Sequence, residues 1–336
     1  MKALALLGLA LLACAAPAFG IVNVTSPASG AQVISPFGLN ATATACSSQS
    51  ITAIGYSVDN STATTIVNGT SVNAQVTSTT GAHTLHVKSW GNLGASCVTN
   101  VAITVVPPPA VFVPANAIAV KGIQALKTWQ AANDTGTGSG TSTGTMALLA
   151  SPSVSGVARQ FATSYTNSAG ERYHVTLGAD TAATNFLYDG WIYLAAPSGD
   201  IANLEFDMNQ VMSNGQTVIY GFQCDGYTDT WDYTENAGTP QNPIDQWRHS
   251  TATCNPRNWS TNAWHHIQVT YSRDSVGNVT YKSVWFDGAE QDIYATVPSA
   301  FALGWRSALL TNFQVDGYGG YGSATAYLDN LTIYRW

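Results

Sequence analysis

Short runs of strand-forming residues, each closed by turn residues, follow one another along almost the whole of this 336-residue chain. Residues 84–88 alternate apolar and polar side chains, which is typical of a strand with one buried face. Asp287-Gly288 lies between two such runs and predicts a tight hairpin turn. The only helix candidate is the short segment 123–132. The pattern therefore predicts an all-β fold of antiparallel strands.

Charged residues make up only 9% of the chain, whereas hydrophobic residues reach 45%. Globular proteins usually carry about 25% charged residues. The net charge is −7 with only 12 Lys and Arg residues, which leaves no basic surface for nucleic acid. The apolar content is sufficient for packed cores, and the length predicts two domains.

Residues 1–20 have the character of a secretory signal peptide. Lys2 precedes an apolar run of about ten residues, which is too short to span a bilayer, and small residues near position 20 allow cleavage before Ile21. The segment 11–14 also resembles a bacterial lipobox, which would leave Cys14 as a lipidated N-terminus. We therefore expect a bacterial protein that is secreted or held at the cell surface, and we expect no transmembrane segment.

Four cysteines remain when Cys14 is set aside with the signal peptide. An even number of cysteines in an exported protein predicts disulfide bonds. Keeping each pair within one domain favours Cys46–Cys97 and Cys224–Cys254. No C-x-x-C pair or interleaved histidine accompanies them, so the pattern does not predict a zinc site.

A run of prolines divides the chain. Residues 21–106 contain few charged side chains, residues 107–117 form a stiff proline-rich linker, and residues 118–336 hold all but one of the 19 acidic residues. In the first part, SPASGAQV at 26–33 and GAHTLHVKSWGN at 81–92 resemble bacterial Ig-like modules. The resemblance implies a small β-sandwich that acts as a spacer.

Three segments of the larger part also point to a known fold: NAWHHIQV at 262–269, VTYKSVWFDGAEQ at 279–291 and YLDNLTIYRW at 327–336. They resemble concanavalin A-like lectin/glucanase domains, including the laminin-G type. The resemblance implies a β-jelly roll of two sheets. Lectins, glycosidases, lyases and adhesins share this fold, so it does not decide the function. The low-complexity stretch 135–145 predicts a surface loop.

Residues 204–210, with the sequence LEFDMNQ, are the segment best suited to carry chemistry. Glu205 and Asp207 project from the same face of a strand. They resemble the E-x-D-x-x-E strand of laminarinase-like retaining glycosidases, in which a bulge brings the last Glu to that face. Gln210 occupies its position, and an amide binds sugar hydroxyls but cannot transfer a proton. Glu205 and Asp207 are therefore candidate catalytic residues only if another acid completes the site. Otherwise, all three side chains would bind a sugar.

The turn-rich segment 225–262 carries further candidates. Sugar rings stack on aromatic side chains, which makes four residues candidate ligand contacts: Trp231, Tyr233, Trp247 and Trp259. The Cys224–Cys254 disulfide would hold this segment as a loop over the acidic strand. Alternatively, these aromatic side chains pack the loop as a small core of their own.

The sequence specifies no metal site. His265 and His266 are adjacent on a predicted strand and point to opposite faces, so they cannot bind one metal ion together. Asp329 matches a position that resembles the structural Ca²⁺ site of laminarinase-like jelly rolls, but one acid does not specify calcium. We expect no cofactor, with a structural Ca²⁺ at Asp329 left open.

Together these features predict an exported bacterial carbohydrate-binding protein with a neutral or weakly acidic polysaccharide as its partner. The missing acid at position 210 favours binding over catalysis. The first alternative is an atypical laminarinase-like glycoside hydrolase or a polysaccharide lyase, with its acid at Asp225, Asp229, Asp232 or Glu235. The second alternative is a structural or adhesive surface module. The oligomeric state stays open.

Overall fold

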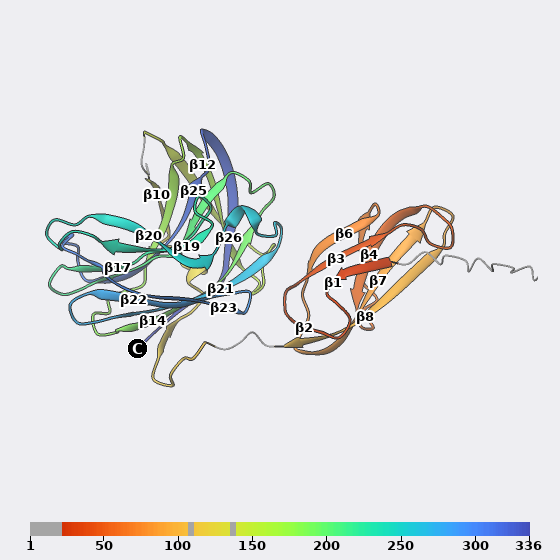
Figure 1. Cartoon of the computed structure of the whole chain (residues 1–336), viewed down its shortest axis with the longest axis horizontal. Coiled ribbons are helices and arrows are strands. Elements are labelled where there is room, and N and C mark those ends of the chain that lie inside the picture. Colours follow the sequence, from red (N-terminus) through yellow and green to blue (C-terminus); the bar gives the residue numbers. More distant parts are fainter. Residues whose placement is uncertain (1–21, 107–110, 135–138) are drawn as a thin grey trace, which may run out of the picture. The chain divides into compact units, whose positions relative to one another are not determined.

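A computed structural model describes residues 22–106, 111–134 and 139–336 of the chain (Figure 1). The described residues form two compact units, divided between residues 106 and 111. The all-β prediction is confirmed, because helical structure in the described residues is limited to two short 3-10 turns, η1 (Ile123–Ala125) and η2 (Pro256–Asn258). None of the helices described is long and apolar enough to cross a membrane. The expected signal peptide and Cys14 lie outside the described residues.

The smaller unit consists of two sheets around a common apolar core. One sheet contains β1 (Val22–Ser26), β3 (Phe37–Ala43) and β6 (Ser71–Val76). The other has the order β2-β8-β7-β4-β5, with β2 (Ala31–Ile34), β8 (Ser96–Val106), β7 (Gly81–Gly91), β4 (Ile51–Val58) and β5 (Thr65–Asn68). Alternate residues of β3 and β7 are buried, including Leu39 and Leu85, which is the pattern expected of strands with one face in a core.

The larger unit contains a ten-stranded sheet and an eight-stranded sheet. The ten-stranded sheet comprises β20 (Asp245–Thr253), β19 (Thr230–Asn236), β18 (Phe222–Asp225), β15 (Ile201–Glu205), β25 (Ala308–Gly317), β16 (Met208–Val211), β17 (Thr217–Tyr220), β24 (Ala300–Phe301), β13 (Gly170–Thr176) and β10 (Gln130–Asp134). The eight-stranded sheet comprises β11 (Ser142–Leu149), β12 (Ala158–Thr166), β26 (Tyr321–Arg335), β14 (Asn185–Leu194), β21 (Trp264–Arg273), β22 (Asn278–Phe286), β23 (Ala289–Pro298) and β9 (Ile118–Val120).

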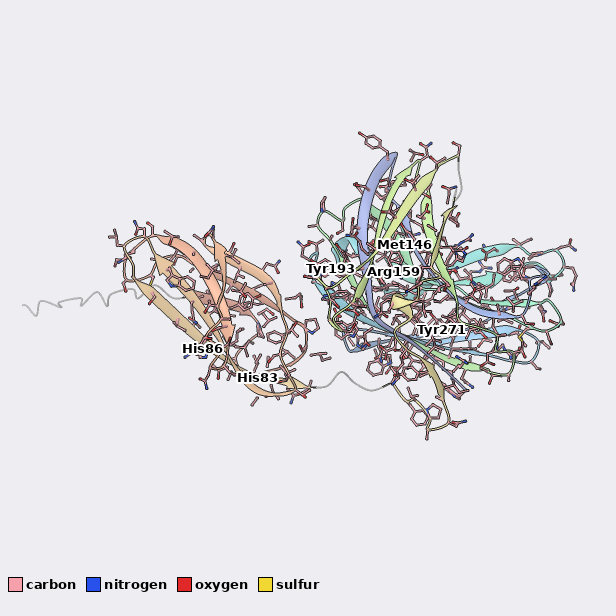
Figure 2. All side chains as sticks on the ribbon, turned by 180° about the vertical axis from the view of Figure 1, so that it is seen from behind. His83, His86, Met146, Arg159, Tyr193 and Tyr271 are labelled. Carbon is pink, nitrogen blue, oxygen red and sulfur yellow. A yellow bond between two sulfur atoms is a disulfide. The ribbon has the colours of Figure 1, made fainter. Side chains whose placement is uncertain are left out.

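Aromatic side chains from both sheets fill the core of the larger unit. Phe161 of β12 contacts Phe313 of β25, with ring centroids 5.1 Å apart, so the contact joins the two sheets. Tyr271 of β21 also lies in this core, where its hydroxyl donates to the carbonyl of Phe206 at 3.2 Å (Figure 2). One face of the ten-stranded sheet thus packs in the core, and its other face is available for a site.

Several local predictions can be compared with the structure. The Asp287-Gly288 turn is confirmed, because both residues have positive φ and join β22 to β23. The helix expected at 123–132 is wrong: only η1 forms, and Gln130–Asp134 pairs with β13 as strand β10. The loop expected at 135–145 is also wrong in part, because β11 begins at Ser142, while residues 135–138 lie outside the described residues.

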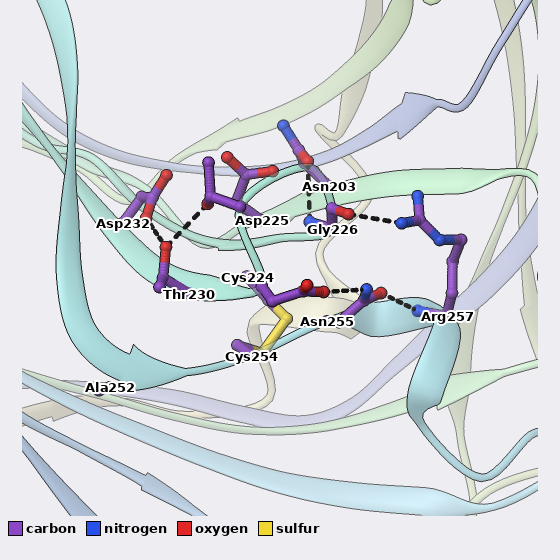
Figure 3. Close-up of a disulfide and its surroundings, with 12 residues drawn as sticks. Asn203, Cys224, Asp225, Gly226, Thr230, Asp232, Ala252, Cys254, Asn255 and Arg257 are labelled. Carbon is purple, nitrogen blue, oxygen red and sulfur yellow. Dashed lines mark hydrogen bonds between the residues drawn. A yellow bond between two sulfur atoms is a disulfide. The ribbon is translucent and has the colours of Figure 1, made fainter.

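Both expected disulfides are present. Cys46 and Cys97 have Cα atoms 5.7 Å apart in the smaller unit, and Cys224 and Cys254 have Cα atoms 5.3 Å apart in the larger one. The second disulfide connects β18 to the residue that follows β20 (Figure 3).

Candidate functional site

The acidic strand runs from β15 into β16 without a bulge. Glu205 pairs with Gln314 of β25, and Met208 pairs with Thr311, so the same number of residues separates the two pairs on both strands. Side chains therefore keep alternating between the two faces of the sheet from residue 205 to residue 210.

Gln210 lies on the opposite face from the acidic residues, which corrects the expectation that a bulge brings it beside them. Its side chain is fully buried, its Nε2 donates to the carbonyl of Ala183 at 3.0 Å, and its Oε1 accepts from Nε of Arg273 at 2.6 Å. These contacts hold the amide inside the protein. The residue that does join Glu205 and Asp207 on the open face is Asn209.

A cleft of about 460 Å³ lies over this face of the ten-stranded sheet. Carboxyl and amide groups, two tryptophans, one arginine and one histidine line most of it. The polar and aromatic lining residues are Asp134, Arg172, His174, Thr176, Glu205, Asp207, Asn209, Thr234, Asp245, Trp247, Trp305, Asn312 and Gln314.

Cross-strand pairing explains why these side chains meet. Residues directly opposite each other on neighbouring antiparallel strands project to the same face. One row across the sheet consists of Arg172, Gln314, Glu205, Gln223, Asp232 and His249, on β13, β25, β15, β18, β19 and β20. The next row includes His174, Asn312, Asp207, Thr234 and Trp247. Distant parts of the sequence thus contribute to one polar surface.

Glu205 shares a hydrogen-bond donor with Asp316. Nε2 of Gln314 donates to Oε1 of Glu205 at 2.9 Å and to Oδ1 of Asp316 at 3.0 Å. Burial raises the pKa of Glu205 well above its usual range, and the neighbouring Asp316 carboxyl raises that pKa further. Burial also raises the pKa of Asp316 to about 7. This pair of carboxyl groups therefore retains a proton near neutral pH.

Asp207 is the second buried acid of the cleft. Burial raises its pKa to about 7, although the backbone N–H of Phe222, which donates to Oδ1 at 3.0 Å, works in the opposite direction. Asn312 places its Nδ2 3.5 Å from the other carboxyl oxygen. A carboxyl group in this environment can exist in either protonation state near pH 7.

Arg172 and His174 supply the basic groups of the cleft. Burial lowers the pKa of His174, and the charge of Arg172 lowers it further, so the imidazole is neutral at pH 7. Arg172 is therefore the one cationic side chain that lines the described cleft at neutral pH.

The segment 225–262 was expected to form a loop over the acidic strand, and this expectation is wrong. Much of the segment is part of the sheet itself. It forms β19, whose side chains alternate between the core and the cleft face, and β20, an outer strand whose side chains are mostly exposed. Trp231 points into the core, fully buried, and stacks on Phe222 with ring centroids 5.3 Å apart. Its neighbours in the strand, Asp232 and Thr234, lie on the other face. Trp231 is therefore a core residue and not a ligand contact.

The other aromatic candidates divide in the same way. Tyr233 packs against Tyr281 with ring centroids 5.1 Å apart, and Trp259 packs against Phe286 at 4.8 Å. Trp247 alone of the four candidates lines the cleft. The other three thus pack in the main core of the larger unit and not in a small core of the segment's own, as the alternative supposed.

The sequence analysis missed several residues of the cleft. Trp305, whose exposed fraction is 49%, lies in the turn before β25, and its surroundings carry no recognisable motif. Other omissions had a detectable signal, because Asn312 and Gln314 alternate with apolar residues, as do Arg172 and His174. That alternation predicts polar side chains on one face of a strand but not which strands lie beside it.

The oxygens of Asp329 are occupied by hydrogen-bond donors. They accept from the backbone N–H groups of Val154 at 2.7 Å and Ser155 at 3.0 Å, and from the hydroxyl of Ser153 at 2.5 Å. Nε2 of Gln124 donates to the same carboxyl at 3.2 Å. Calcium requires oxygen ligands, so this set of donors does not fit the ion.

His265 and His266 bond to separate acids, as their opposite directions predict. Nδ1 of His265 lies 2.8 Å from Oδ2 of Asp287, and Nε2 of His266 lies 2.7 Å from Oδ1 of Asp189. These pairs connect the turn after β22 and strand β14 to β21.

No family model matches the sequence, and comparison with curated proteins finds no match. Among solved structures, the chain is similar to one described as a carbohydrate-binding module of the β-sandwich superfamily, at 11% identity, over 93% of this chain and 96% of that one, with a TM-score of 0.33. It is also similar to the cellulose induced protein Cip1, at 15% identity, over 61% and 90% of the two chains, with a TM-score of 0.38. A third similar structure is the carbohydrate recognition domain of Emp47p, at 10% identity, over 62% of this chain and 89% of that one, with a TM-score of 0.34.

Proposed function

We propose that this protein binds a polysaccharide in the cleft of its ten-stranded sheet. The observation that carries the proposal is the combination of two tryptophans, Trp247 and Trp305, with carboxyl and amide groups around one open cleft. Aromatic rings stack on the C–H faces of sugars, while carboxylates and amides bind their hydroxyl groups. The proposal rests on this chemistry and not on the similarities to solved structures.

The charge of the cleft favours a neutral glycan. Four acids, Asp134, Glu205, Asp207 and Asp245, line it together with one permanently charged base, Arg172. Uronate groups would add like charges to a partly buried site, which is unfavourable. Of the neutral and weakly acidic polysaccharides expected from the sequence, we therefore propose the neutral class.

We infer that the larger unit is a concanavalin A-like jelly roll and that the smaller unit is an Ig-like spacer of an exported bacterial protein. The two disulfides support an oxidising compartment outside the cytoplasm. The larger unit would then carry the binding function, and the smaller unit would hold it away from its point of attachment.

The test is binding to a panel of soluble polysaccharides by calorimetry and affinity electrophoresis. We expect binding to at least one neutral polymer among β-glucan, xyloglucan, xylan and mannan, and weaker binding to alginate and pectin. Trp305→Ala should reduce the affinity by about fivefold, since stacking on an aromatic ring contributes on the order of 1 kcal/mol.

A matched control is Tyr321→Ala, which removes a highly exposed aromatic side chain outside the cleft. It should leave the affinity unchanged. Wild-type protein that binds none of the polymers, or binding that is insensitive to Trp305→Ala, would contradict the proposal and favour a structural surface module.

A second candidate function is glycoside hydrolysis or polysaccharide lysis. The observation that favours it is that Asp207 in the cleft and Asp316 beside it hold protons near pH 7, since a general acid must be protonated at working pH. Mass spectrometry of the supernatant after incubation with the same polymers distinguishes the two functions. Oligosaccharides that disappear in Glu205→Gln would establish an enzyme, whereas retention without products would establish a binding protein.

A further inference from the structure

A group of potential metal ligands lies on the same face of the sheet, beside the cleft. Asp225 of β18, Asp232 of β19 and His249 of β20 each offer one ligand atom, and these atoms lie within 4.8 Å of one another. Asp232 and His249 are direct cross-strand partners, with Nδ1 of the imidazole 2.8 Å from Oδ2 of the carboxylate. Figure 3 shows Asp225 and Asp232 close together above the Cys224–Cys254 disulfide.

The two carboxyl groups are buried with little positive charge to balance them. The exposed fraction is 5% for Asp225 and 0% for Asp232. Among the described residues, neither forms an ion pair with Lys or Arg, and Asp232 has only the imidazole of His249 as an ionic partner. Adjacent buried carboxylates are costly unless one of them takes up a proton or a cation accompanies them.

Gln223 provides independent support. It lies directly opposite Asp232 on β18, so its side chain projects from the same face beside that carboxylate. Its exposed fraction is 2%, and its Oε1 is buried with no hydrogen-bond partner in the described part of the chain. Buried polar atoms nearly always have a partner, so an oxygen without a donor beside two carboxylates is what a cation site requires.

We propose that Asp225, Asp232 and His249, with the amide oxygen of Gln223, bind a divalent transition-metal ion such as Mn²⁺ or Zn²⁺. Carboxylate oxygens combined with an imidazole nitrogen suit these ions better than Ca²⁺ or Mg²⁺, which take oxygen ligands. Bonds of about 2.0–2.2 Å require the cluster to contract on binding, since its ligand atoms lie within 4.8 Å of one another.

An ion can reach the cluster from solvent, and its binding would affect the structure of the sheet. The His249 side chain is 56% exposed, so solvent reaches the cluster from that side. The ligands come from three successive strands, and β20 is the outer strand of that sheet path. A bound ion would fasten β20, which carries Trp247, to the rest of the sheet.

The test is calorimetric titration of the full chain with MnCl₂ and with ZnCl₂ after treatment with EDTA and removal of the chelator. We expect one ion to bind per chain. His249→Ala and Asp232→Asn should each weaken the binding at least tenfold.

The smaller unit provides a matched control. His83 and Asp59 form a similar pair, 2.7 Å apart, without a third ligand, so His83→Ala should not change the affinity. His249 is largely exposed, so its variant is expected to fold, and circular dichroism checks this. The proposal is overturned if the wild type binds neither ion at millimolar concentration, if both cluster variants bind as the wild type does, or if His83→Ala removes the binding.

Discussion

The two units of this protein are both built mainly from antiparallel strands around an apolar core, with β2 and β8 of the smaller unit as a parallel pair. They differ in how many polar residues they bury. In the described part of the smaller unit, Ser57 and Ser89 are the buried polar residues. In the larger unit, the ten-stranded sheet buries carboxyl groups and amides in adjacent rows, among them Glu205, Asp207 and Gln314.

This difference distinguishes strands that only stabilise a fold from strands that also form a site. The alternation of apolar and polar residues in the smaller unit is what a sheet needs to pack one face and expose the other. The larger unit departs from that rule on the face that carries the cleft, where burial of acids raises their pKa values. Burying such groups opposes folding, so their concentration at one cleft indicates a functional site.

The largest expected effect concerns the tryptophans of the larger unit. Trp231→Ala should lower the free energy of unfolding by about 3–5 kcal/mol, because it empties a fully buried position in the core. Trp305→Ala removes a half-exposed side chain at the cleft and should change stability by less than about 0.5 kcal/mol. Urea denaturation of the two variants measures this contrast. Similar losses in both would mean that Trp231 is not the core residue described above.

The disulfides allow the two units to be compared directly. Replacing Cys46 and Cys97 by alanine should cost about 4 kcal/mol, and replacing Cys224 and Cys254 should cost slightly less, because the loops span 51 and 30 residues. Thermal unfolding of the two double variants tests the order. If the shorter loop contributed clearly more, loop entropy would not be the main source of the stabilisation.

Asp316, which is hydrogen-bonded to Gln314 of the cleft, should make the stability of the larger unit depend on pH. The folded-state pKa of Asp316, about 7, lies above its ordinary value of 3.8, so the folded protein holds this proton more tightly than the unfolded chain does. The contribution is full below about pH 4 and is lost as the pH rises through about 7. Asp316→Asn should therefore stabilise the protein at pH 8, on the order of 1 kcal/mol, and much less at pH 5.

Chemical denaturation at pH 5, 6, 7 and 8 measures that dependence, with Asp292→Asn as a control at an exposed position of β23. A stability difference between Asp316→Asn and the wild type that is the same at every pH would show that the carboxyl group does not retain its proton.

The smallest effect is expected in the smaller unit, at the Asp59–His83 pair. Asp59→Asn should change the free energy of unfolding by less than about 0.5 kcal/mol, because the Asp59 side chain is 47% exposed and surface ion pairs contribute little. Asparagine also tolerates the positive φ of 52° at this position. Denaturation at pH 6 measures the change, and a loss above 1 kcal/mol would mean that the smaller unit also depends on a polar cluster.

The all-β class, many strand positions, the Asp287-Gly288 turn and the disulfide pairs could be predicted from the sequence. These features depend on local patterns, such as alternation along a strand, or on simple rules for cysteines in exported proteins. The same local information placed Glu205 and Asp207 on one face of a strand, where the structure has them.

The tertiary structure decided which residues share the cleft. Gln210 faces the opposite side because β15 and β16 pair with β25 in one continuous register, and Trp231 faces the core because the segment 225–262 joins the sheet. His174 reaches the cleft from β13, far in the sequence from Asn312 on β25 and Trp305 in the segment before it. A one-residue change in register reverses the face of every side chain on a strand, and register is set by pairing with distant strands. The sequence alone therefore determined the strands and their chemistry, whereas long-range pairing determined the site.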